Sequence, residues 1–135
     1  MEARAHREAD GGTKTDLFKL MKQRGRTRLT SSIWAQALEH EDPLAIELID
    51  RAVEALGAGI ASAVNLLDVE AVIIGGGLGV RFGLPMTERI TRAMHPHLFN
   101  DTRPPAVHVA GLGDLSGGLG AALLVSRAAG PEQIA

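Results

Sequence analysis

The chain has 135 residues, a formal net charge of −2 and no cysteine. The length fits one domain, and the near-neutral charge gives no electrostatic argument for nucleic-acid binding. The missing thiols exclude a disulfide framework and a thiolate metal site, and they fit a reducing cytoplasm. No apolar run is long enough to cross a bilayer, so we expect a cytoplasmic protein without a membrane partner.

Residues 1–41 are predicted to form a helical segment distinct from the rest. Residues 1–10 alternate Ala with charged residues and predict a polar helix that ends at a pair of glycines. Residues 14–28 are strongly basic, but no aromatic stacking platform accompanies them, so a solvated helix face is favoured over a phosphate-binding face. A short helix is predicted over residues 31–39.

A long helix is predicted to start at Asp42-Pro43, because Asp is a favoured N-cap and Pro a favoured first helical residue. Its apolar residues recur every three or four positions up to Leu67. The helix is therefore expected to begin amphipathic and to end buried nearly all round. Gly57 and Gly59 each cost about 0.5–1 kcal/mol relative to Ala, and we expect them to allow a neighbouring backbone to approach closely.

Residues 71–74 are a continuous apolar run rich in β-branched side chains, which predicts a short central strand covered by helices on both faces. The strand leads directly into Gly75, Gly76 and Gly77, followed by Leu78. Glycines allow a sharp turn and let backbone N–H groups approach a ligand closely. Taken alone, this cluster also fits a tight strand-to-helix turn that binds nothing.

The remaining chain predicts a helical segment that opens at Pro85, a second strand over residues 106–110 and a final helix over about residues 116–128, whose small residues imply tight packing. Strands that alternate with helices predict a parallel sheet with right-handed crossovers. Ligands of such sheets bind beyond the carboxyl ends of the strands, where the glycine clusters at 75–79 and 111–113 are expected. Two strands make no stable sheet alone, so the chain looks like half of a domain.

Three local patterns resemble known sites but lack necessary parts. Residues 75–80 fail the dinucleotide pattern G-x-G-x-x-G because position 80 is Val, and no P-loop Lys-Ser or Lys-Thr follows. Residues 10–14 resemble the phosphate loop of actin-like sugar kinases, but the spacer after the Asp and the preceding strand are absent, so we expect a helix-ending turn. His95 and His97 flank a proline without nearby carboxylates, so we assign no metal ligand.

Residues 55–78 resemble the C-terminal signature of the ROK family (repressors, open reading frames, kinases), in which a helix ending in Asn-Leu-Leu-Asp leads to a strand and to glycines that contact a nucleotide. Residues 112–123 are similar to the closing helix of that family. The match covers residues 42 to 126 in the same order and spacing. Residues 1–41 are similar to the helical region that follows the zinc loop in bacterial glucokinase-type members.

The resemblance implies the actin-like ATPase fold, an α/β fold of two ribonuclease-H-like lobes. Residues 42–130 would form the C-terminal part of the nucleotide-binding lobe, with parallel strands and flanking helices. Residues 1–41 would be the extra N-terminal helical segment.

The resemblance also implies that Gly75, Gly76 and Gly77 lie beside the adenosine and phosphates of ATP, with Leu78 flanking the base. No catalytic residue is carried over to this chain, because the phosphate loop, the catalytic Asp, the sugar-binding residues and the cysteine zinc loop all lie upstream in the family. We therefore expect a C-terminal fragment that is inactive alone, since phosphoryl transfer needs a positioned nucleophile, base and metal.

For the full-length protein the resemblance implies a glucokinase-like hexose kinase, a transferase of carbohydrate metabolism and glycolysis that uses ATP and Mg²⁺. Its partners would be the nucleotide and a hexose, without nucleic acid; polyphosphate remains open as the donor. The alternative is the C-terminal, sugar-sensing part of a ROK transcriptional repressor. The incomplete sheet predicts exposed apolar edges, to be covered by a missing N-terminal lobe, by another copy in a homo-oligomer, or by residues 1–40.

Overall fold

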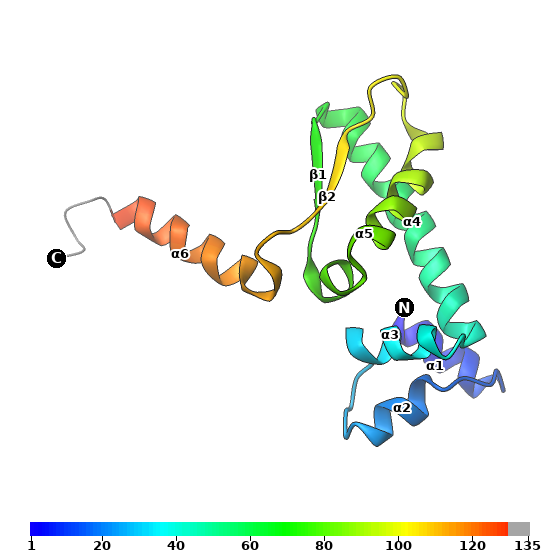
Figure 1. Cartoon of the computed structure of the whole chain (residues 1–135). Coiled ribbons are helices and arrows are strands. Elements are labelled where there is room, and N and C mark those ends of the chain that lie inside the picture. Colours follow the sequence, from blue (N-terminus) through cyan, green and yellow to red (C-terminus); the bar gives the residue numbers. More distant parts are fainter. Residues whose placement is uncertain (130–135) are drawn as a thin grey trace.

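The computed structural model describes residues 1–129, apart from the side chains of residues 114, 116 and 129. It confirms the predicted α/β class, because two parallel strands alternate with helices (Figure 1). No helix within these residues combines the length and the apolar character needed to cross a membrane. The elements are, in chain order, α1 (Glu2–Asp10), α2 (Leu17–Gln23), α3 (Ser31–Glu39), α4 (Pro43–Leu67), β1 (Ala71–Ile74), α5 (Gly76–Met94), the 3-10 turn η1 (His95–His97), β2 (Ala106–Val109), the 3-10 turn η2 (Gly113–Leu115) and α6 (Ser116–Ala129).

The N-terminal helices α1, α2 and α3 share one apolar core with α4 and α5. The lysines and arginines of residues 14–28 are exposed, as a solvated helix face requires. The apolar side chains between them point inward and join those of the later helices. Among the buried members of this core are Ala5, Leu17, Leu20, Ile33, Trp34, Leu44, Leu48, Ile49, Met86 and Ile90.

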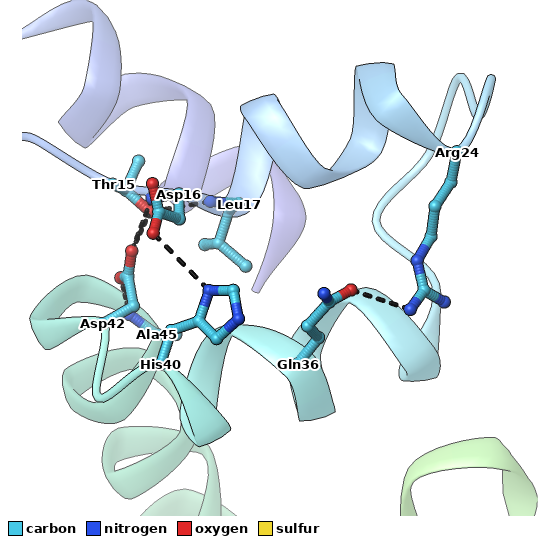
Figure 2. A network of polar contacts seen from close by, with 8 residues as sticks. All are labelled: Thr15, Asp16, Leu17, Arg24, Gln36, His40, Asp42 and Ala45. Carbon is cyan, nitrogen blue, oxygen red and sulfur yellow. Dashed lines mark hydrogen bonds and ion pairs between the residues drawn. The ribbon is translucent and has the colours of Figure 1, made fainter.

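Asp42 connects the N-terminal helices to α4. As predicted, it is the N-cap: its Oδ1 accepts a hydrogen bond from the Ala45 N–H at 2.9 Å. Its Oδ2 accepts two more, from the Thr15 hydroxyl at 2.9 Å and from the Asp16 N–H at 2.6 Å. Figure 2 shows this network, in which His40 also approaches the carboxylate of Asp16. A carboxylate that is 5% exposed is thus satisfied by three donors from two segments.

The second half of α4 is less buried than predicted. Ile49 and Val53 lie in the core, but Leu56, Leu66 and Leu67 are exposed, Leu66 by 82%. The prediction that this helix ends buried nearly all round is therefore wrong, because its last turns are covered on one side only, where Ala61 is buried and Asn65 binds the His97 carbonyl.

Gly57 and Gly59 have different environments, although both were expected at a close contact. A Cβ added at Gly57 would stand 2.6 Å from the Cβ of Ala93 and 2.8 Å from the backbone nitrogen of Met94. This confirms that α5 crosses α4 at Gly57. At Gly59 the same Cβ would meet no atom within 4 Å, so the expectation is wrong there.

The strands β1 and β2 pair in parallel, with Ala71 opposite Ala106 and Ile74 opposite Val109. Side chains alternate between half-buried and exposed along both strands, and Ile73 is 62% exposed. The prediction that helices cover both faces is wrong, because α4 and α5 lie on the same side of the sheet (Figure 1). The predicted exposed apolar surface is confirmed, and residues 1–40 do not cover this face.

A bend divides α5 at Gly83, whose backbone has φ +55° and ψ −137°. Pro85 follows the bend and begins the second part, in agreement with the predicted helix start there. The predicted inner stripe is confirmed, since all its members are buried: Met86, Ile90, Ala93 and Met94.

The last helix, α6, leads away from the body of the molecule (Figure 1). Its small residues were expected to pack tightly. A Cβ added at Gly117, Gly118 or Gly120 would instead meet no atom within 4 Å, so that prediction is wrong within this chain. The apolar side chains of the helix are exposed, Leu124 by 70%.

Candidate functional site

The glycine turn, defined here as residues 75–78, joins the end of β1 to the start of α5. Gly75 is the N-cap of α5 and has an extended backbone, with φ −118° and ψ −165°. No side chain caps this helix start. Gly75, Gly76 and Gly77 are exposed, and Leu78 is half-buried. The turn therefore presents bare backbone to solvent at the carboxyl end of a strand.

Specific contacts account for the glycines in and after this turn. Gly76 has φ +76°, a conformation that strains any residue with a Cβ. Gly79 is buried, and a Cβ there would stand 2.8 Å from Cγ2 of Ile74. At Gly77, a Cβ would stand 3.2 Å from the Ser31 hydroxyl oxygen. The shape of the turn thus depends on the absence of side chains.

The second glycine cluster, residues 111–113, lies at the same edge of the sheet. Because the strands are parallel and in register, both carboxyl ends point the same way. The Ala110 N–H donates to the Ile74 carbonyl at 2.9 Å, and a Cβ on Gly75 would stand 3.5 Å from the Cβ of Ala110. The two clusters therefore follow neighbouring strand ends at the carboxyl edge of the sheet, as predicted.

An apolar cavity of about 170 Å³ lies beside the glycine turn. Leu78, Gly79 and Ile74 line one side, and the α4 residues Val53 and Leu56 line another. An apolar cavity of about 150 Å³ accommodates a benzene ring. The turn thus combines exposed N–H groups with an adjoining apolar hollow.

Sequence reasoning did not identify the contact between Ser31 and Gly77. Ser31 is the first residue of α3, and its Cβ would lie 3.5 Å from a Cβ on Gly77. No local pattern around residue 31 indicates this contact, because it depends on how α3 packs on the core.

The other candidate patterns form ordinary turns. The Gly11 N–H donates to the Arg7 carbonyl and the Thr13 N–H to the Glu8 carbonyl, so residues 10–14 end α1 as expected. His95 and His97 are exposed in η1, where the His97 carbonyl accepts from Asn65 Nδ2 at 2.9 Å. Among the side chains that the structure describes, which leave out Asp114, no three His, Asp or Glu residues gather as a metal site would require.

The fold and the glycine turn define an α/β unit, with helices beside a parallel sheet and a bare turn at its carboxyl edge. The chain belongs to the ROK family, whose profile matches residues 13–128.

Sugar kinases are among its relatives. The N-acetylgalactosamine kinase AgaK of Shewanella sp. (strain ANA-3) is 39% identical over 92 residues, which cover 67% of this chain and 29% of AgaK. The crystal structure of a ROK family glucokinase from Streptomyces griseus in complex with glucose and AMPPNP is similar, with a TM-score of 0.61 and 31% identity. That likeness covers 72% of this chain and 31% of the glucokinase chain.

A second solved structure supports the same fold. The putative sugar kinase from Cytophaga hutchinsonii ATCC 33406 has a TM-score of 0.67 at 24% identity, over 91% of this chain and 40% of the other. The neighbours have the actin-like ATPase fold, which confirms the fold predicted from the resemblance. The chain spans about a third of the length of the relatives it matches.

Proposed function

We propose that Gly75, Gly76 and Gly77 bind the phosphates and ribose of ATP, with Leu78 beside the base. The exposed backbone of the glycine turn at the carboxyl edge of the sheet carries this proposal. Its N–H groups and the uncapped start of α5 suit an anion. The apolar cavity next to Leu78 suits a flat base.

For the whole protein we propose a glucokinase-like hexose kinase that moves the γ-phosphoryl group of Mg-ATP to a sugar hydroxyl in the cytoplasm. The similarity to AgaK and to the Streptomyces griseus glucokinase supports a kinase over a transcriptional repressor. This chain corresponds to the C-terminal part of the nucleotide lobe, so we expect it to transfer no phosphoryl group alone.

The metal and the catalytic groups lie outside this chain in our proposal. We assign no catalytic Asp and no metal ligand to residues 1–129. Mg²⁺ would be held by the nucleotide phosphates and by residues of the remaining protein, and any zinc loop would lie upstream.

A titration of the ¹⁵N-labelled chain with Mg-AMPPNP tests the glycine turn. We expect the amide resonances of Gly75, Gly76 and Gly77 to move with saturation. Gly76→Val should weaken binding at least about tenfold, because valine is strained at φ +76°.

Gly59→Ala is the matched control, since Gly59 is exposed and a Cβ there meets no atom within 4 Å. It should bind AMPPNP like the wild type. Equal affinity of the wild type and Gly76→Val, or glycine resonances that stay in place, would contradict the proposal.

A further inference from the structure

The glycine turn is held between two elements that are distant in sequence. On one side, Ala110 at the end of β2 lies in ordinary van der Waals range of a Cβ built on Gly75, at 3.5 Å. On the other side, the Ser31 hydroxyl oxygen lies only 3.2 Å from a Cβ built on Gly77, which is tighter than an ordinary contact. In Figure 1 the start of α3 lies directly below the turn that joins β1 to α5.

The Ser31 side of this contact is held firmly. Ile33 and Trp34, two and three residues further along α3, are 0% and 2% exposed and belong to the common core. The start of the helix is further ordered by a 2.9 Å hydrogen bond between the hydroxyls of Thr30 and Ser32. Because close-packed cores resist displacement, the position of Ser31 is set by the core of the N-terminal helices.

The Gly77 side is much less constrained. Gly77 is exposed, and Ser31 contributes both atoms that approach its Cβ position within 4 Å. Ser31 therefore provides the nearest atoms beside Gly77, while Leu78, the next residue of the turn, packs against the core.

We propose that Ser31 is a positioning residue for the glycine turn. Its side chain sets the distance between α3 and Gly77, and thereby the placement of the N–H groups that meet the nucleotide. The effect on nucleotide affinity rests on the function proposed above, whereas the effect on the turn does not. In this proposal Ser31 acts on the site through its approach to Gly77 and does not touch the ligand.

A compensation experiment tests this assignment. Gly77→Val crowds Ser31, so it should shift the amide resonances of Gly75 and Gly76 in the free chain and weaken AMPPNP binding about tenfold. Adding Ser31→Gly to this variant makes room, and should return both the resonances and the affinity to within about twofold of wild type. Adding Ser32→Gly removes a neighbouring hydroxyl without making room at Gly77, so it should rescue neither.

Ser31→Ala separates positioning from direct binding. It keeps the Cβ that lies 3.5 Å from the Gly77 position, so affinity should stay within about twofold of wild type. A large loss of affinity in Ser31→Ala with unmoved glycine resonances would assign Ser31 to the ligand and overturn the proposal. Failure of Ser31→Gly to rescue Gly77→Val, or equal rescue by Ser32→Gly, would overturn it too.

The melting temperature of each variant provides the third readout. A role in folding alone would change the melting temperature without the paired change in resonances and affinity, and would contradict the proposal. If wild-type chain binds no AMPPNP, the proposed function fails, while the resonances of the free variants still decide the role of Ser31.

Discussion

At the scale of single residues, Asp42 has the largest set of polar contacts in Figure 2. It caps α4 through the Ala45 N–H and also accepts from Thr15 and Asp16, which precede α2. The cap was predictable from the Asp-Pro pair, because both residues favour a helix start. The bonds to Thr15 and Asp16 were not, since they depend on the packing of α2 against the start of α4.

We expect Asp42→Ala to lower the free energy of unfolding by roughly 2–4 kcal/mol, because it removes the cap and leaves donors unpaired in a buried place. Urea unfolding followed by circular dichroism measures the change. Asp101→Ala is the control, since Asp101 is exposed, and it should stay within about 0.5 kcal/mol of wild type. Similar effects of the two substitutions would show that the Asp42 network adds little.

Some glycines are required by the local backbone conformation, and others are required because a distant part of the chain packs against them. Gly76 requires a positive φ, and a glycine cluster after a strand indicates such a turn. Gly57 and Gly77 are needed because another element approaches them, and the sequence near each does not identify that element. The location of the candidate site was thus predictable, but the contact with Ser31 was not.

At the scale of elements, helices with clear start or stop signals were predicted well. The ends of α1 and α3, the start of α4 and the strand β1 match the predicted ranges. The burial of β1, α4 and α6 did not match the prediction. An apolar pattern indicates that a face needs a packing partner, but it does not identify that partner. In this chain Ile73, Leu66 and Leu124 remain exposed.

The crossing of α4 and α5 predicts that alanine substitutions at two glycines of α4 change the stability of the chain in opposite directions. Gly57→Ala should destabilise the chain by roughly 1–3 kcal/mol, because its Cβ would collide with Ala93 and the backbone of Met94. Gly59→Ala should stabilise it by about 0.5–1 kcal/mol, because Ala favours a helix and open space surrounds the site. Thermal unfolding of both variants measures these effects. A stability change in the same direction for both would contradict the described crossing.

At the scale of the whole molecule, α4 and α5 lie on one face of the sheet and the other face is uncovered. Ile73 of β1 lies on the open face, and α6 carries further exposed apolar side chains. Monomeric proteins rarely expose large contiguous apolar surfaces, and sheet edges tend to pair. We therefore expect the isolated chain to self-associate.

Ile73→Lys should reduce this self-association, since the side chain already faces solvent and the charge opposes burial at a contact. Sedimentation velocity over a range of concentrations measures it. Gln23→Lys adds the same charge at the exposed end of α2 and should leave association unchanged. A wild-type chain that stays monomeric at every concentration would contradict the expectation.

The parallel pairing of β1 and β2 has a consequence for the order of folding. All of α5 and η1 lies between the two strands, so their hydrogen bonds, such as that from the Ala106 N–H to the Glu70 carbonyl, form only after α5 docks on α4. We therefore expect the sheet that ends at the glycine turn to form last during folding and to lose its hydrogen bonds first during local unfolding. In native-state hydrogen exchange, the Ala106 and Ala110 amides should lose their protons before those of Ile49 and Val53 in α4.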